Sequence, residues 1–516
     1  MPFRSDKARI TAVLWLAFLL RMVGLNGRYL WYDEAFAILY AEKPFSTMLY
    51  GTIAQSPSGA AADVHPLLYY TLLHGWMQLT GQSLLAVRLL SVVLGLLMVA
   101  VVYRVATMLF NTRVGLVAAL LTGVSPFAVY YAQETRMYAL LGLASAWVVW
   151  AFVRGWQNGR WQVWAQFALF GALTMYAHNL GALFIATIGL WTAFQWWQKR
   201  YWHRFRQVIG AYLLMLVLFL PWLLILPSQL GKLRESYWVM RPGLLKLMQT
   251  VLVFHFMAEN EATPVWLLGA GLFAVTLTIA WVLLIGWKNR MRLQEYGRAG
   301  SWSLIIGLTL MPVLLNFAIS QIQPVYIIRS LLPSAWAYYV LLAAIGVSPA
   351  VPNKIRYTTG GLLVGVMAVA LMNHYTYHGF PRVPAAELTA MIRPKIDEGG
   401  VVVHANKGTF FPMVYFDRGL PQQFLADEPG SPNDTLAYPT QVALGLFAAP
   451  NLETAVADAT QVWYVIFRLD VEEYAANNLT LPDVAWLQKK YHLTSTQMMD
   501  DVVVYQFDCC FDSSGE

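Results

Sequence analysis

The fold of this protein is decided by QSLLAVRLLSVVLGLLMVAVVY, residues 82–103, an apolar stretch in which Arg88 is the one charged residue. A helix of this length can cross the hydrocarbon core of a membrane, which is about 30 Å thick. Apolar segments of about 16 to 23 residues recur from Arg9 to Asn373. Because lipid offers the backbone no hydrogen-bond partners, these segments are expected to be helices. The sequence therefore predicts an all-α polytopic membrane bundle.

Composition supports the same class of protein. Of the 516 residues, 58% are hydrophobic and 12% are charged, whereas about 25% are charged in soluble domains. Beyond residue 378 the polarity becomes normal, and the remaining length suffices for one soluble domain. We therefore divide the chain into a membrane domain, 1–378, with a first outer loop at 26–81, and a C-terminal domain, 379–516.

About eleven crossings are predicted. They are 9–25, 82–103, 113–131, 136–153, 161–178, 180–197, 208–226, 264–287, 303–320, 327–347 and 358–373. One further apolar stretch, 65–80, is about 16 residues long and contains His65, His74 and Gln78, so we interpret it as an interfacial helix on the outer face. If it crossed instead, the basic loop at 104–113 would face outward.

The basic residues gather in alternate loops. These hold Arg4, Lys7 and Arg9; Arg104 and Arg113; Arg154 and Arg160; Lys199, Arg200, Arg204 and Arg206; Lys288, Arg290, Arg292 and Arg298; Lys354 and Arg356. Positive charge marks the cytoplasmic side, so the N terminus is predicted to be cytoplasmic. An odd number of crossings then places the C-terminal domain outside. The net charge of +7 follows from these loops and does not indicate nucleic acid.

The C-terminal domain shows helical and strand patterns. AAELTAMIRPKI at 385–396 is helix-like, while VVVH at 401–404, WYVIF at 463–467 and VVVYQF at 502–507 are short β-branched or aromatic runs. Such alternation predicts a small α/β domain.

An acidic pair, Asp33 and Glu34, follows the first span in WYDEAF, residues 31–36. A carboxylate at the outer rim of a bundle can act as a catalytic base toward lipid-borne substrates. The pair is equally consistent with capping a helix that begins in the first outer loop, because acids favour helix N-termini.

Four further outer residues form the rest of the candidate site. His65 can donate to a phosphate or to a helix end; Glu134 and Arg136 lie in a predicted outer hairpin, where they can bind a ligand or pair with each other. Arg329 lies at the mouth of the tenth span, where lipid headgroups commonly satisfy arginine. Positive charge is scarce on this side, so the two arginines indicate an anionic ligand. His178 and Asn179, in a short turn, are weaker candidates.

Together these residues can displace a phosphate leaving group. The carboxylates supply a base for an incoming hydroxyl, and the cations stabilise the departing oxyanion. No glycine-rich phosphate loop and no HExxH motif occurs, so nucleotide hydrolysis and zinc proteolysis are not supported.

Five stretches resemble the GT-C type glycosyltransferases, in the branch of protein O-mannosyltransferases and lipid A aminoarabinose transferases. They are WYDEAF at 31–36, HPLLYYTLLHGWMQLTG at 65–81, VRLLSVVLGLLMVAVVYRVATMLF at 87–110, SPFAVYYAQETRMYAL at 125–140 and PVYIIRSLLP at 324–333. The resemblance implies a polyprenyl-phosphate sugar donor, transfer outside the cytoplasm, and a multi-pass protein of a bacterial plasma membrane. The acceptor can be a glycan, a lipid or a protein.

The resemblance also implies individual roles. Asp33 matches the family's catalytic base, with Glu34 as its companion; His65 matches a His or Lys before a Pro-Pro pair; Arg329 matches an arginine that contacts the donor phosphate. Leu67 replaces the second proline, and the tail lacks the sugar-binding repeats of eukaryotic mannosyltransferases, so a protein acceptor does not follow. No cofactor is expected. Some distant relatives use a divalent metal, but the sequence offers no ligand cluster beyond Asp33 and Glu34.

The main alternative is a transporter or flippase of a lipid-linked sugar. Transporters place charged or helix-broken sites near the membrane midplane, often within inverted repeats. Here the unusual charges gather at the outer boundary, which favours an inverting glycosyltransferase. A non-catalytic lipid-binding membrane protein is a third possibility.

Overall fold

The computed structural model describes residues 2–55, 61–198, 202–235, 239–257, 264–288, 297–349, 351–376, 379–427 and 436–509. Contacts divide the chain into two units. The bundle unit comprises Met1–Leu25, His65–Pro227 and Val239–Tyr377; the tail unit comprises Asn26–Val64, Ser228–Trp238 and His378–Glu516. This grouping differs from the predicted division at residue 378, which counted residues 26–64 with the membrane domain.

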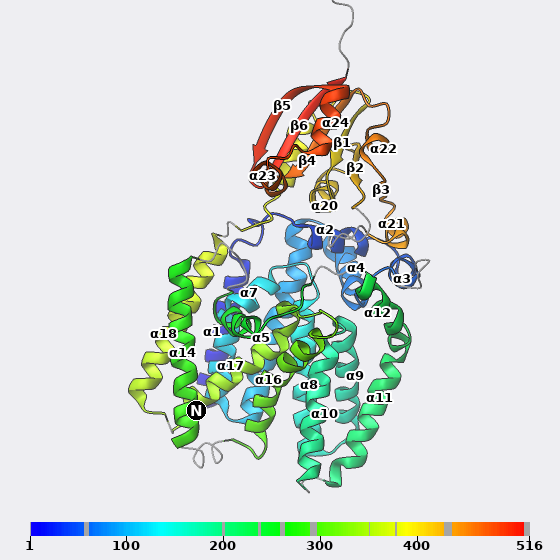
Figure 1. Cartoon of the computed structure of the whole chain (residues 1–516). Coiled ribbons are helices and arrows are strands. Elements are labelled where there is room, and N and C mark those ends of the chain that lie inside the picture. Colours follow the sequence, from blue (N-terminus) through cyan, green and yellow to red (C-terminus); the bar gives the residue numbers. More distant parts are fainter. Residues whose placement is uncertain are drawn as a thin grey trace, which may run out of the picture. The chain divides into compact units, whose positions relative to one another are not determined.

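The bundle unit is helical (Figure 1). Each of the eleven predicted spans overlaps a helix or a pair of consecutive helices. The helices are α1 (Pro2–Met22), α5 (Leu84–Leu109), α6 (Thr112–Val124), α7 (Pro126–Ala132), α8 (Tyr138–Asn158), α9 (Trp161–Ala177), α10 (Gly181–Trp197), α11 (Phe205–Leu223), α14 (Val265–Lys288), α16 (Ser301–Ser320), α17 (Leu332–Val347) and α18 (Asn353–Tyr375). The predicted helical membrane bundle is confirmed.

Length and composition qualify six helical segments of the described residues as membrane spans. They are Leu84–Leu109, Tyr138–Asn158, Trp202–Leu223, Ser301–Ser320, Ile328–Val347 and Asn353–Tyr375. A seventh is added if the bent pair α6 and α7 counts as one span. Helices α9 and α10 have 17 residues each, about 25 Å at 1.5 Å per residue, which is short of the hydrocarbon thickness.

The predicted span at 113–131 is wrong in one respect, because it is not a continuous helix. Helices α6 and α7 meet at an angle of 62°. Pro126 has no N–H to continue the ladder of α6. The Ser125 hydroxyl instead accepts the N–H of Ala128 at 3.2 Å and thereby caps α7. The bend directs the chain after α7 into the interior of the bundle unit.

Shorter helices lie in the two long loops that are predicted to face outward. The predicted interfacial helix at 65–80 begins later, as α4 (Leu68–Thr80). A second loop predicted to face outward, at about 227–263, holds α12 (Leu226–Glu235) and α13 (Leu245–Phe256). Its residues 236–238 and 258–263 lie outside the described ranges. Helix α13 packs into the bundle, since Phe254 is buried against Phe127 of α7 with ring centroids 5.5 Å apart.

The tail unit contains a six-stranded mixed sheet in the order β3-β2-β1-β4-β6-β5. The strands are β1 (Gly400–His404), β2 (Gln422–Leu425), β3 (Ala448–Ala449), β4 (Gln461–Phe467), β5 (Tyr491–Met499) and β6 (Val502–Cys509). The first four in that order are parallel, and β6 runs antiparallel to both of its neighbours, β4 and β5. The predicted α/β domain is confirmed, including strands at all three predicted positions.

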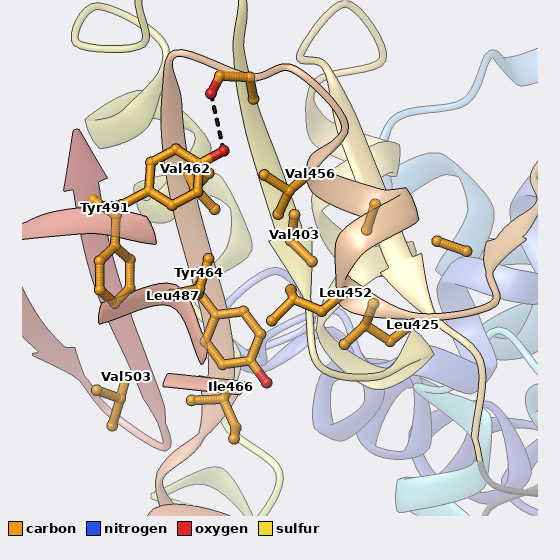
Figure 2. Packing of buried hydrophobic residues seen from close by; sticks show 14 residues of the cluster. Val403, Leu425, Leu452, Val456, Val462, Tyr464, Ile466, Leu487, Tyr491 and Val503 are labelled. Atoms are coloured by element: carbon orange, nitrogen blue, oxygen red, sulfur yellow. Dashed lines mark hydrogen bonds between the residues drawn. The ribbon is translucent and has the colours of Figure 1, made fainter. Parts of the chain in front are cut away.

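Both faces of the sheet are covered. All seven residues of β4 are buried, and they alternate between two cores, as the period of two in a strand requires. Val462, Tyr464 and Ile466 join the core shown in Figure 2, where the Tyr491 hydroxyl also donates to the Ala459 carbonyl at 3.1 Å. On the other face, Trp463 and Val465 pack with α19 (Ala385–Ile392) and α20 (Lys407–Phe416).

A buried histidine ties the end of β1 to its surroundings. His404 Nδ1 lies 3.0 Å from the Thr409 hydroxyl on α20, and Nε2 lies 3.2 Å from Gln422 Oε1 on β2. Burial lowers the pKa of His404 to about 3, so its imidazole is neutral at physiological pH. The hydrogen bond from His404 to Thr409 therefore spans the loop that leads from β1 into α20.

Candidate active site

The segment between α7 and α8 is a buried, irregular turn. Residues Gln133, Glu134, Thr135 and Arg136 are each at most 3% exposed, and the Arg136 N–H donates to the Glu134 carbonyl at 2.8 Å. The prediction of an outer hairpin correctly placed a break here. However, it did not foresee that both charged residues are buried inside the bundle unit. Buried ionisable residues in a membrane bundle are costly, and they commonly mark functional sites.

Gln133 holds this turn in place. Its Nε2 donates to the carbonyls of Arg21, at 2.9 Å, and Val23, at 2.7 Å, while its Oε1 lies 2.8 Å from His374 Nε2 on α18. The last carbonyls of a helix have no partners within that helix. In the turn after α1, the guanidinium of Arg88 donates to the carbonyl of Leu25 at 2.6 Å. The turn is thus fastened to α1 and α18.

Arg329 points into the bundle unit, toward α8. It lies in a 3₁₀ turn, Ile328–Leu331, that precedes α17. Its guanidinium lies over the ring of Tyr138, 5.3 Å from the centroid. A snorkelling arginine would extend toward the headgroups, so this cation–π contact favours an inward role.

Two histidines, His178 and His65, lie near Tyr138 and near each other. The ring of His178 lies 6.1 Å from that of Tyr138 and 6.4 Å from that of His65. His178 Nδ1 accepts the N–H of Leu180 at 3.1 Å, so a neutral ring carries its proton on Nε2. His178, which sequence analysis ranked lowest, therefore lies between His65 and Tyr138.

Arg136 belongs to the same group. Its Nη1 donates to the Tyr70 hydroxyl of α4 at 3.4 Å, and His178 lies within electrostatic range of His65, Arg136 and Arg329. The structure therefore brings three of the predicted residues together around His178. Two guanidinium groups and two imidazoles in a largely buried site are suited to an anion with several oxygens, such as a phosphate.

The acidic pair belongs to the tail unit. Asp33 and Glu34 lie in the first turn of α2 (Tyr32–Ala41), whose N-cap is Trp31, so neither acid is the N-cap residue. Asp33 is partly exposed, whereas Glu34 is only 1% exposed. A partly exposed carboxylate can reach a substrate hydroxyl; a buried one is better suited to holding its neighbours.

Sequence reasoning missed several residues of the site. Tyr70 and Tyr138 contact predicted residues, and Gln133, next to Glu134 in the chain, fastens its turn to α1 and α18. Their polar or aromatic character inside apolar surroundings was a usable signal. Within the described ranges, no three His, Cys, Asp or Glu side chains lie close enough together to hold a metal ion.

Residues 64–225 match the model of a family described as dolichyl-phosphate-mannose-protein mannosyltransferase. The matched segment includes His65, Glu134, Arg136 and His178. The whole chain also has the fold of ArnT from Cupriavidus metallidurans. With ArnT in the apo state the TM-score is 0.62 at 14% identity, covering 97% of this chain and 98% of that one.

The family model matches residues 64–225, and the fold shared with ArnT extends over nearly the whole chain. The resemblance inferred from sequence motifs is thereby confirmed. ArnT bound to undecaprenyl phosphate gives a TM-score of 0.61 at 13% identity, and the alignment covers 96% of this chain and 97% of ArnT. No curated protein sequence matches the chain.

Proposed function

We propose that this protein is a glycosyltransferase that transfers a sugar from a polyprenyl phosphate to an acceptor hydroxyl on the outer face of the membrane, with inversion at the anomeric carbon. The cluster of His65, Arg136, His178 and Arg329 in the bundle unit carries the proposal, because it offers an anion site without any nucleotide motif. ArnT, which shares the fold, has been captured with undecaprenyl phosphate, and this supports a donor of the same class.

In the proposed reaction, Asp33 removes the proton of the acceptor hydroxyl as its oxygen attacks the anomeric carbon. The bond from that carbon to the phosphate oxygen breaks, and its electron pair stays on the phosphate. Arg136, Arg329 and His65 stabilise this charge. Glu134 shares the buried turn with Arg136 and is proposed to help position it, whereas Glu34 supports the base.

Purified full-length protein in detergent tests this function. We expect labelled sugar to move from undecaprenyl phosphate hexoses or pentoses onto a component of a cell-envelope extract, with release of undecaprenyl phosphate. Detergent removes the two compartments that transport needs. A transporter or flippase would therefore leave all label on the carrier, and that outcome would overturn the proposal.

We further propose about eleven crossings, with a cytoplasmic N terminus and the tail outside. The eleven helical positions and the alternation of basic loops support this orientation. The two cysteines of the chain are Cys509 and Cys510, and Cys509 is exposed.

An impermeant maleimide should therefore label the wild-type protein in intact spheroplasts. As a control, Asn158→Cys in a Cys509→Ser, Cys510→Ser background should react only after permeabilisation, since Asn158 is exposed at the end of α8 that is predicted to be cytoplasmic. The reverse pattern would overturn the orientation.

A further inference from the structure

The first outer loop is fastened to the C-terminal part of the chain within the tail unit. Near its start, the Tyr29 hydroxyl donates to Asp500 Oδ2 at 2.9 Å, and Asp500 pairs with Arg382 at 2.8 Å. Burial, and then the interaction with Asp500, raise the pKa of Tyr29, so the hydroxyl keeps the proton that it donates. About midway along it, the Thr440 hydroxyl donates to the carbonyl of Gly51 at 2.8 Å.

Between these anchors, α2 packs against α20 (Figure 1). Phe411 of α20 contacts two residues of α2, with ring centroids 5.4 Å from Tyr32 and 6.1 Å from Phe36. Phe411 is completely buried and also contacts Phe424 of β2, at 6.0 Å. The aromatic contacts thus connect α2 to the sheet.

A cation lies at the N-terminal end of α2. The ammonium of Lys407, at the start of α20, lies 5.3 Å from the ring centroid of Tyr32, the residue that immediately precedes Asp33. Lys407 and Phe411 are four positions apart and so lie on the same face of α20. Asn406 fixes the start of this helix, because its Oδ1 accepts the N–H of Gly408 at 2.8 Å.

These contacts determine which way the acidic pair points. Tyr32 and Phe36 are one turn apart, so holding both against Phe411 stops α2 from rotating about its axis. Each residue of a helix is turned by about 100° from the one before, and the directions of Asp33 and Glu34 therefore follow from those of Tyr32 and Phe36. At the far end of α2, Glu42 pairs with Arg418, which follows α20.

We propose that Lys407 and Phe411 are positioning residues for the acidic pair, so that a helix of the C-terminal α/β domain orients the proposed base. This inference rests on the proposed role of Asp33 as the base. Phe411 sets the rotation of α2, and Lys407 holds Tyr32, the residue next to the base, through a cation–π contact. A small displacement of a reacting group is enough to reduce turnover about 100-fold.

Turnover of purified full-length enzyme at saturating undecaprenyl phosphate sugar provides the test. We expect Lys407→Gln and Phe411→Leu each to lower kcat by about 10- to 100-fold, with the donor KM within about twofold of the wild-type value, because the donor phosphate is assigned to residues of the bundle unit. Lys407→Arg should retain most of the activity, since a guanidinium also stacks on tyrosine.

Matched controls separate positioning from stability. Phe416→Leu changes an exposed aromatic residue on the opposite side of α20, and Lys395→Gln changes an exposed lysine of the same domain; both should leave kcat unchanged. The Lys407→Gln protein should unfold at the wild-type temperature, because Lys407 is only partly buried.

Two outcomes would overturn the inference and are distinguishable. If Asp33→Asn is inactive while Lys407→Gln and Phe411→Leu turn over normally, α20 does not position the pair and only this inference fails. If Asp33→Asn is itself active, the proposed base is wrong and the inference fails with it.

Discussion

Asp33→Asn is expected to lower kcat by about 10² to 10⁴, the usual contribution of a general base. The amide has the shape of the carboxylate but cannot take up the proton of the acceptor hydroxyl. Asp33 is the more exposed member of the pair, in the first turn of α2, so its replacement should leave expression and donor binding nearly intact. Turnover at saturating donor, together with the affinity for undecaprenyl phosphate, measures both parts of this prediction.

Glu34→Gln is the matched comparison. Because Glu34 is buried, we assign it to holding the first turn of α2, and its amide variant should lose less activity than Asp33→Asn. If the Glu34 variant were inactive and the Asp33 variant normal, the two roles would have to be exchanged. If neither change mattered, the proposed mechanism would be wrong.

Arg329→Ala is expected to weaken binding of undecaprenyl phosphate by about 10- to 150-fold. A charge-assisted hydrogen bond to a phosphate contributes about 1.5 to 3 kcal/mol, and about 1.4 kcal/mol corresponds to a factor of ten. Arg329→Lys should recover only part of this affinity, because an ammonium lacks the planar fork of a guanidinium. Titration of purified protein in detergent with undecaprenyl phosphate measures the dissociation constant directly.

Helix α8 offers a close control for this variant. Arg154, near its other end, lies over the ring of Trp150 at 4.6 Å, just as Arg329 lies over that of Tyr138 at 5.3 Å. Arg154→Ala therefore removes a similar cation–π contact from the same helix. It should leave donor affinity unchanged; equal losses in both variants would show that the effect comes from disturbing α8 and not from a phosphate contact.

The bundle was predictable because a membrane imposes strict local rules. An apolar stretch in lipid has to satisfy its own backbone and therefore forms a helix, so hydropathy located the helices of the bundle. In the tail, the strands at Val401, Trp463 and Val502 stood out as β-branched or aromatic runs. Strand β5 did not, because YHLTSTQMM places one face toward solvent and carries few strongly apolar residues.

The candidate residues were predictable by type but not by environment. Arg136 and Arg329 were predicted to bind an anion because cations are rare on the side predicted to face outward. The structure places both within electrostatic range of His178. The burial of Glu134 and Arg136 could not be foreseen, since it depends on the bend at Ser125 and Pro126 that directs the following turn inward. Mean hydropathy over residues 113–131 shows no break at these two residues, so the pattern predicts one continuous span.

The sequence by itself determined that this is a helical membrane protein with an α/β tail, together with the identity of the charged residues available for chemistry. Only the tertiary structure decided which of them meet. Gln133 and His374 are 241 positions apart, and Tyr32 meets Lys407 and Phe411 only because the first outer loop packs on the C-terminal domain. Helix and strand patterns arise from neighbours within a few residues, whereas such contacts depend on side-chain packing across the whole fold, which no local pattern records.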